Sequence, residues 1–313
     1  MPLFSVIIPL YNKENFIEAT LQSVFMQTFT DYEIIIVNDG STDASAEVVK
    51  KAIQRKPKAA LINQKNQGLS ATRNNAIHMA KGEIIALLDA DDLWDKNYLS
   101  EIYKLYKKFP DVSLFGTDYF EKYSNNNILE PKKNIEANLK ETSFLIPDFF
   151  KANWFQPIIA PSCFSIKKEV FYDLTFNEKI TFAEDVDFYI KSNLKYKFAY
   201  CYNALATVHF NVPNQMTSIG FKGKQIPNFD FYESDTKNHP SLKKYLDYSR
   251  YYLLISAKIA NDTENYNALH KHLDTNNLYF KQRLLLNLPT PVLKLFRWVK
   301  KLLLKQNIRL TSY

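Results

Sequence analysis

The N-terminal third of the chain alternates short apolar runs with longer segments in which apolar residues recur at helical spacing. The apolar runs are Phe4–Pro9, Glu33–Val37, Ala59–Ile62 and Ile84–Leu88. The helical segments between them are Ile17–Met26, Ala44–Gln54 and Ala71–Met79. The apolar runs start about 25 to 29 residues apart, the length of one strand–helix unit. Runs such as VIIPL are apolar throughout, as strands covered on both faces are. The pattern predicts an α/β fold with a mostly parallel, Rossmann-like sheet flanked by helices.

Beyond about Leu93 the alternation loosens, and the predicted elements become less regular. We expect a helix over Asn97–Phe109, a strand over Val112–Tyr119, a strand at SCFSI (162–166), and helices over Tyr245–Asn261 and Asn265–Asn287. The polar stretch Lys122–Lys140 predicts a long loop. We therefore divide the chain into an α/β domain over residues 1–220, a helical extension over 221–288 and a tail over 289–313.

Glycine is scarce, with six in the whole chain, so the position of each is informative. Gly40 and Gly68 each follow a predicted strand and precede a helix. Open α/β sheets bind ligands at such places, outside the carboxyl ends of their strands. Gly82 follows the third helix and predicts a C-cap. Ser41–Asp43 and Ser70 are typical of the starts of the second and third helices.

Two carboxylates, Asp89 and Asp91, follow the apolar strand IIALL and are separated only by Ala90. At a strand end both can reach one divalent cation, and Mg²⁺ or Mn²⁺ prefers oxygen ligands and bridges to phosphate oxygens. The alternative is a solvated acidic turn in which Asp92 or Asp95 caps the following helix. We favour the metal site over the acidic turn because two loops at neighbouring strand ends also carry residues suited to ligand binding.

The first of these loops, NDGSTD (38–43), places Asp39 at the end of the second strand. A carboxylate there can accept hydrogen bonds from a ribose or a base, although the same sequence also makes a good turn and helix start. The second loop, NQGLSATRN (66–74), offers backbone donors at a helix start. It also carries Arg73, which is either a phosphate ligand or a surface residue.

Further candidates lie far downstream. Glu184 and Asp185 begin a predicted short helix and point in different directions, so one can face a ligand while the other anchors the loop. A positioned carboxylate there is a reasonable general base, whereas the helix dipole alone also favours an acidic first turn. His209 ends a mixed strand and is either a ligand or a structural residue.

Five of these motifs, in this order and spacing, resemble those of the family 2 glycosyltransferases with the GT-A fold. They are VIIPLYN (6–12), NDGSTD (38–43), NQGLSATRN (66–74), LLDADD (87–92) and AEDVDF (183–188). The resemblance spans about residues 3 to 220. It implies an inverting enzyme that transfers a sugar from a nucleotide-sugar donor, usually a UDP-sugar, to a hydroxyl.

The same resemblance implies roles for individual residues. The implied substrate-binding residues are Pro9, Tyr11, Asn12, Asp39, Gly68, Arg73, Asp89, Ala90 and Glu184. Asp91 and His209 would hold Mn²⁺ or Mg²⁺. Asp185 would take the proton of the acceptor hydroxyl in a single displacement that inverts the anomeric centre.

The formal net charge of +7 is concentrated at one end of the chain. Residues 275 to 313 include eight basic and no acidic residues, which leaves 32 basic against 33 acidic residues elsewhere. In the tail, one helical face carries Lys294, Arg297, Lys301 and Lys305, and the other carries Leu295, Phe296, Val299, Leu302 and Leu303. Such a helix predicts in-plane binding to an anionic membrane surface. Packing on the α/β domain or in a dimer is the alternative.

Other features concern the compartment and the class of partner. The two cysteines cannot form a disulfide framework, and no run of about 18 apolar residues predicts a membrane span. We expect a cytoplasmic protein, peripheral on the inner face of the membrane, with a glycan or lipid-linked acceptor in cell-surface polysaccharide synthesis and no nucleic-acid partner. One alternative is a sugar nucleotidyltransferase, but PLYNKENF lacks the glycine-rich phosphate loop it needs. Another is a non-catalytic nucleotide-sugar-binding protein at a membrane.

Overall fold

A computed structural model describes residues 1–124, 127–213, 215, 220–305, 308 and 310. Its strands are β1 (Phe4–Leu10), β2 (Tyr32–Asp39), β3 (Ala59–Gln64), β4 (Ile84–Leu87), β5 (Leu93–Trp94), β6 (Leu114–Ser124), β7 (Asn127–Leu129), β8 (Ser143–Leu145), β9 (Phe164–Lys167) and β10 (Phe198–His209). Within the described residues these ten strands form one sheet of order β3-β2-β1-β4-β9-β6-β10-β5, with β7 paired to β6 and β8 to β10.

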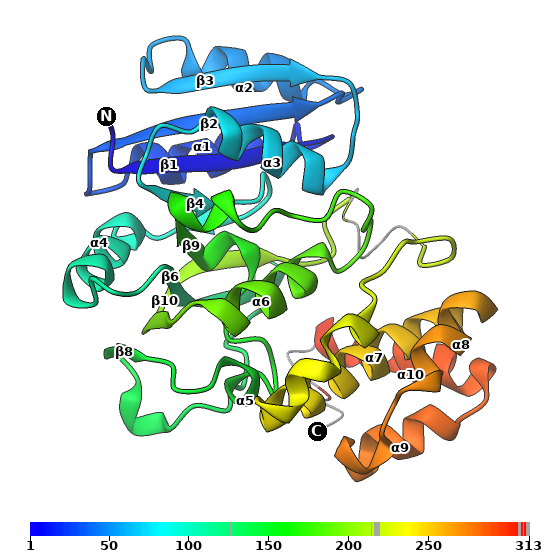
Figure 1. The fold of residues 1–313 in the computed structure, drawn as a ribbon. Coiled ribbons are helices and arrows are strands. Elements are labelled where there is room, and N and C mark those ends of the chain that lie inside the picture. The colour runs from blue at the N-terminus through cyan, green and yellow to red at the C-terminus, as the bar shows by residue number, and fades with distance from the viewer. Residues whose placement is uncertain (125–126, 214, 216–219, 306–307, 309, 311–313) are drawn as a thin grey trace.

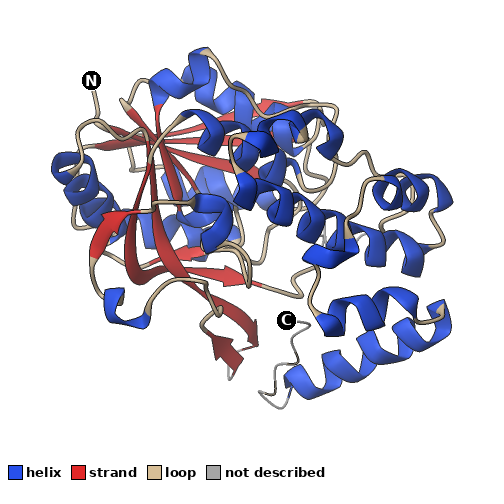
Figure 2. Ribbon diagram, turned by 60° about the horizontal axis from the view of Figure 1, so that its bottom comes forward, coloured by secondary structure: helices blue, strands red, loops and turns tan. Residues whose placement is uncertain are grey.

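Helices cover both faces of this sheet (Figure 2). The helices are α1 (Ile17–Phe25), α2 (Ser45–Ile53), α3 (Leu69–Met79), α4 (Tyr98–Lys108), α5 (Phe149–Ala152), α6 (Glu184–Lys195), α7 (Pro240–Ala260), α8 (Thr263–Lys271), α9 (Phe280–Asn287) and α10 (Thr290–Lys305). Short 3₁₀ turns lie at Ala137–Leu139, Pro161–Cys163, Lys168–Tyr172, Phe229–Tyr232, Ser234–Lys237 and Thr275–Asn277. α1 and α2 lie on one face, and α3 and α6 lie on the other (Figure 1).

The predicted strand–helix repeat is confirmed, and it aligns the strand ends that matter for function. β1 pairs in parallel with β2 and β4, and β2 pairs in parallel with β3. All seven residues of β1 are buried, as its unbroken apolar run predicts. The sheet becomes mixed beyond β4, because β9 runs antiparallel to both β4 and β6. The carboxyl ends of β1, β2, β3 and β4 therefore meet at one edge.

The prediction of a long loop over Lys122–Lys140 is wrong in its first half. β6 continues to Ser124 and pairs with β7, although residues 125 and 126 lie outside the described residues. The polar composition of this stretch suggested solvent exposure, but the Lys133 side chain is buried inside the protein. It forms an ion pair with Asp118 of β6. Its ammonium also lies 5.2 Å from the ring centre of Tyr119. A buried, paired lysine cannot be told from a solvated one in the sequence.

The expected single helix over Asn265–Asn287 is two helices, α8 and α9, separated by a turn. Asp274 accepts a hydrogen bond from the backbone nitrogen of Asn276 at 2.9 Å, which favours a turn over a continuing helix. The buried carboxylate of Asp247 in α7 accepts a bond from the Asn277 side chain at 2.7 Å. This tertiary contact holds the turn in place.

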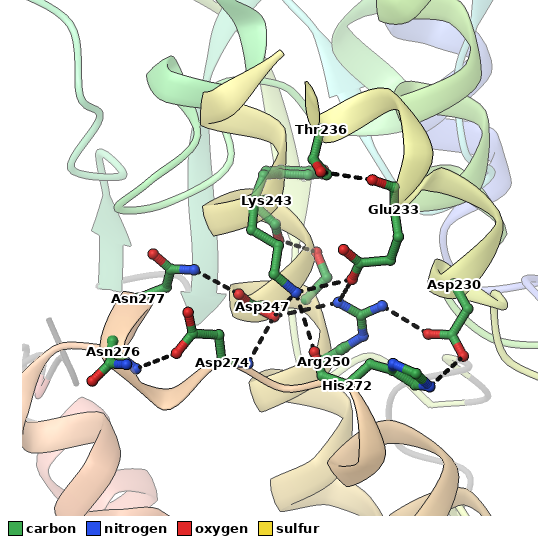
Figure 3. Close-up of polar contacts among 12 residues, drawn as sticks. Asp230, Glu233, Thr236, Lys243, Asp247, Arg250, His272, Asp274, Asn276 and Asn277 are labelled. Atoms are coloured by element: carbon green, nitrogen blue, oxygen red, sulfur yellow. Dashed lines mark hydrogen bonds and ion pairs between the residues drawn. The ribbon is translucent and has the colours of Figure 1, made fainter. Parts of the chain in front are cut away.

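A cluster of ion pairs around the buried Arg250 and Asp247 joins α7 to the residues that precede it (Figure 3). The guanidinium of Arg250, in α7, lies 2.9 Å from Asp230, 2.6 Å from Glu233 and 3.3 Å from Asp247. Lys243, one turn from Asp247, contacts both Asp247 and Glu233. The extension is therefore fastened to its own first residues.

Two details of the third helix also differ from expectation. α3 begins at Leu69 with Gly68 as the N-cap residue, so Ser70 lies inside the helix. The helix ends at Met79, and Gly82 is not its C-cap. Instead the chain passes close to β1 at Gly82, where a β-carbon would lie 2.5 Å from the backbone nitrogen of Ser5. Glycine is needed there for close approach.

Candidate active site

Asn12 joins the end of β1 to the loop that follows β2. Its backbone nitrogen donates to the Ser41 hydroxyl at 3.0 Å, and its side-chain oxygen accepts from the Thr42 backbone nitrogen at 2.8 Å. Asn12 has a φ of 51°, a left-handed conformation that asparagine tolerates better than most residues. Pro9 is buried within β1, and Tyr11 is 40% exposed at the edge of the sheet. Of these three predicted substrate-binding residues, Tyr11 therefore has the side chain that is most exposed to a ligand.

Asp39 shapes the loop that precedes α3. One of its carboxylate oxygens accepts from the Gln64 side chain at 2.9 Å and the Gln67 backbone nitrogen at 2.8 Å. The other accepts from the backbone nitrogen of Gly68 at 3.0 Å. Gly68 has a φ of 89°, which glycine adopts without strain. Asp39 therefore fixes the backbone of this turn, and its predicted contact with the nucleoside stays a prediction.

Arg73 is a buried bridge between three elements. It is 1% exposed, so the alternative of a surface arginine is wrong. Its two terminal nitrogens contact Glu184 of α6 at 2.8 Å and Asp89, after β4, at 2.9 Å. Burial disfavours the charge, but the carboxylates of Asp89 and Glu184 outweigh it and raise the pKa of Arg73 above its usual value. A fixed positive charge thus lies between the two acidic motifs.

Asp185 occupies the first turn of α6, next to this bridge. It is partly buried, and one of its oxygens accepts from the backbone nitrogen of Val186 at 2.9 Å. Burial, and then the adjacent Glu184 charge, raise the pKa of Asp185 to about 7, with Arg73 acting against them. A carboxyl group poised near neutral pH suits a general base.

The backbone before α6 is held in an uncommon conformation. Ala183 has a φ of 61°, which carries a steric cost for a residue with a β-carbon. The backbone nitrogens of Thr181 and Phe182 both donate to the carbonyl of Gln225 from the helical extension, at 2.8 and 3.1 Å. The extension thereby helps to position Glu184 and Asp185, a role that the sequence does not reveal.

Asp91 and Asp92 face different partners. The Asp91 carboxylate lies 2.9 Å from the ammonium of Lys13, which sequence analysis did not identify. Asp92 does not cap the following helix. It is buried, and it accepts from the Ser162 hydroxyl at 2.5 Å and the His209 backbone nitrogen at 2.9 Å. Asp92 therefore fastens the end of β10 to the acidic loop.

Of the two predicted metal ligands, His209 has a ring nitrogen that is unpaired within the described part of the chain, whereas Asp91 is already paired with Lys13. Its Nδ1 is buried and has no hydrogen-bond partner among the described residues. Burial, and then the charge of Lys122, lower the pKa of His209, while the Asp91 carboxylate opposes them, and the lowered pKa favours the neutral imidazole that metals require. No group of three or more His, Cys, Asp or Glu side chains within the described residues is gathered to hold a metal. That Asp91 and His209 hold a divalent cation therefore stays a prediction, supported by the buried Nδ1 of His209 that no described residue partners.

The edge of the sheet thus gathers most of the predicted residues. Asp89 and Glu184 both contact the guanidinium of Arg73, and Asp185 lies close enough to feel the charges of all three. Ala90 is buried, and its backbone carbonyl accepts a hydrogen bond from the Thr20 hydroxyl at 3.1 Å. This bond holds the backbone of the acidic loop in position.

The family model for "Glycosyl transferase family 2" matches residues 5–175. The chain belongs to this family, which makes it a glycosyltransferase with the GT-A fold that its motifs predict. Family membership decides against the nucleotidyltransferase and non-catalytic alternatives.

Named relatives agree with the assignment. The chain is 31% identical to the uncharacterized glycosyltransferase MJ1057 of Methanocaldococcus jannaschii over 68% of this chain and 72% of that one. It is 30% identical to the uncharacterized glycosyltransferase EpsJ of Bacillus subtilis, covering 71% of this chain and 65% of EpsJ. It is 29% identical to a chondroitin synthase of Pasteurella multocida over 79% of this chain but only 26% of that enzyme.

The fold also matches solved structures. Residues 1–349 of S. aureus TarS in complex with UDP-GlcNAc align with a TM-score of 0.60 at 18% identity, covering 88% of this chain and 89% of that one. At this level of identity the likeness shows the fold alone.

Proposed function

We propose that this glycosyltransferase uses a nucleoside diphosphate sugar, with UDP as the nucleotide, and transfers the sugar with inversion to a hydroxyl of a glycan or lipid-linked acceptor. The observation that carries the proposal is the bridge of Arg73 between Asp89 and Glu184, with Asp185 beside it. The UDP-GlcNAc complex of TarS, which shares the fold, supports the class of donor. The name of the chondroitin synthase relative supports a role in polysaccharide synthesis.

In this proposal each residue has one task. Asp185 accepts the proton of the acceptor hydroxyl as that oxygen attacks the anomeric carbon, and the nucleoside diphosphate leaves. Asp39 and Gly68 hold the turn on which the nucleoside rests. Arg73 fixes Asp89 and Glu184 beside the donor. Asp91 and His209 would hold Mn²⁺ or Mg²⁺, which supplies positive charge for the leaving diphosphate.

The test is a panel of sugar nucleotides incubated with the full chain and Mn²⁺, read by thermal stabilisation and by release of nucleoside diphosphate. At least one UDP-sugar should stabilise the protein and release UDP. Asp91→Ala should lose the Mn²⁺-dependent stabilisation, while Lys50→Met, an exposed lysine of α2 paired with Glu47, should keep it. Stabilisation by sugar nucleotides of another base only would contradict the choice of UDP.

We also propose that α10 docks this enzyme on an anionic membrane surface. Leu293 is buried against the protein, whereas the apolar side chains on the outer arc of α10 are exposed. The exposed set is Val292, Leu295, Phe296, Trp298 and Leu302. Lys294, Arg297 and Lys301 are also exposed, and residues 275 to 313 include no acidic residue. The charge and the apolar face together match a lipid surface carrying negative headgroups.

No helix among the described residues is long and apolar enough to span a bilayer. In the proposal the helix lies in the interface, so that a lipid-linked acceptor reaches the site from the cytoplasmic face of the membrane.

A further inference from the structure

Lys13 lies at the centre of the candidate site but has no role in the proposed reaction. Its ammonium is 2.9 Å from an Asp91 carboxylate oxygen and 3.0 Å from the backbone carbonyl of Pro213. The side chain is only 10% exposed. Its backbone nitrogen donates to the Ser45 hydroxyl at 2.7 Å in a buried hydrogen bond, so the start of the side chain is fixed.

The Asp91 carboxylate needs a positive partner. It is nearly buried, and two further carboxylates, Asp89 and Asp92, belong to the same four-residue turn. Asp89 is neutralised by Arg73, and Asp92 is held by a hydroxyl and a backbone nitrogen. Lys13 is the cation found on Asp91 in the described part of the chain.

An ammonium and a divalent cation compete for one carboxylate. A Mg²⁺ ion bound to a carboxylate oxygen lies about 2.0–2.1 Å from it, and the Lys13 ammonium already lies 2.9 Å from one oxygen of Asp91. Two cations so close repel strongly in a site that water barely reaches. A metal that binds this same oxygen of Asp91 must therefore push the ammonium away.

We propose that Lys13 is a built-in counter-cation of Asp91 that a divalent metal displaces, and that this displacement releases the segment at Pro213. The inference rests on the metal site of the proposed function. Pro213 follows β10, which ends at His209, so the same ammonium that occupies Asp91 also ties this segment to the site.

The structure offers space for the exchange. A cavity of about 240 Å³ opens beside Lys13, lined by Asn12, Glu14, Phe16, Asp43 and Pro213 among others. The displaced ammonium can move into this cavity, where Glu14 and Asp43 supply carboxylates. Movement of a flexible four-carbon side chain is sufficient, and β1 and β4 stay in place.

The experiment measures Mn²⁺ binding to the full chain directly, by loss of the free Mn²⁺ electron paramagnetic resonance signal, with and without UDP. Lys13→Met should bind Mn²⁺ about tenfold or more tightly than the wild type, because the competing charge is gone. Lys13→Arg, which keeps the charge, should bind Mn²⁺ as weakly as the wild type. Lys50→Met serves as the matched surface control and should change nothing.

A second readout follows the segment at Pro213. Hydrogen exchange of a peptide covering residues 209–213 should speed up when Mn²⁺ is added to the wild type. In Lys13→Met it should be fast already without metal. Circular dichroism of each variant shows whether it is folded.

Equal or weaker Mn²⁺ binding by folded Lys13→Met, with binding lost in Asp91→Ala, would overturn the role of Lys13 and leave the metal site standing. If Asp91→Ala binds Mn²⁺ as the wild type does, the metal site of the proposed function is wrong, and the inference falls with it. The same holds if neither the wild type nor Lys13→Met binds Mn²⁺ with UDP present.

Discussion

The guanidinium of Arg73 donates to the carboxylate of Glu184 at 2.8 Å, although 111 positions separate the two residues in the chain. Arg73 belongs to α3, and Glu184 is the first residue of α6. The other terminal nitrogen of Arg73 contacts Asp89, so a single buried cation joins two acidic motifs that are distant in sequence. The geometry of the candidate site depends on this one side chain.

Arg73→Met should destabilise the protein strongly. The substitution keeps an apolar stem of similar length but leaves the carboxylates of Asp89 and Glu184 without their partner. Loss of one member of a buried ion pair costs about 3–5 kcal/mol in the free energy of unfolding. Urea unfolding measures this. Arg55→Met, at an exposed position after α2, should change stability by less than about 0.5 kcal/mol. A similar small change for both variants would contradict the bridging role.

Asp185→Asn should abolish most of the sugar transfer while leaving donor binding intact. Removing a general base lowers kcat by about 10²–10⁴-fold. The affinity for the nucleotide, measured by calorimetry with UDP, should stay within about twofold because Asn keeps the shape of the side chain. In the wild type kcat/KM should rise as pH increases through about 7, the pKa of Asp185, since only the ionised form accepts a proton. A flat profile between pH 6 and 8 would argue against this base.

The same residue should make the wild type less stable as pH rises. The folded-state pKa of Asp185 is about 7, whereas an unfolded aspartate titrates near about 4. The unfolded chain therefore loses this proton first, and the stability contributed by protonated Asp185 is lost between about pH 4 and pH 7. Asp185→Asn should gain stability relative to the wild type as pH goes from 5 to 8. Urea unfolding of both proteins at pH 5 and at pH 8 measures this gain. If the difference in stability between variant and wild type is the same at both pH values, burial does not raise the pKa of Asp185.

The full chain should bind vesicles that contain anionic lipid and not purely zwitterionic ones. Each basic residue near such a surface contributes about 1 kcal/mol, so changing Lys294, Arg297 and Lys301 together to serine should weaken binding about hundredfold. Trp298→Ser should also weaken it, because an exposed apolar anchor is lost. Vesicle flotation measures both.

The control for this measurement is Tyr172→Ser, which removes an exposed aromatic residue of the α/β domain and should leave binding unchanged. Equal binding to neutral and anionic vesicles would remove the electrostatic part of the proposal. A concentration-dependent dimer that Trp298→Ser abolishes would show that a second copy covers α10 instead.

The elements of the N-terminal third were predictable because their signals are local. The run FSVIIPL forms β1 and stays wholly buried, and apolar spacing places α1, α2 and α3 to within about two residues. The motif residues at the ends of β1, β2 and β4 could be singled out for the same reason, since parallel strands bring those ends to one edge. The amphipathic pattern of α10 was also visible in the sequence.

Other features had no local signal. Lys133 looks like a loop residue, yet it is buried on Asp118; Lys13 follows a recognisable motif, yet its partner Asp91 lies on another strand end. The break between α8 and α9 depends on contacts with Asp247, which lies earlier in the chain. The face of α10 that remains exposed depends on how Leu293 packs.

The sequence by itself determined which segments are strands and helices and which acidic residues follow the strands, because those properties depend on neighbours a few positions away. Only the tertiary structure decided which charges meet. The partner of a buried Arg73, Lys13 or Lys133 is chosen by the path of the whole chain, and an ion pair leaves no periodic trace in the residues around it.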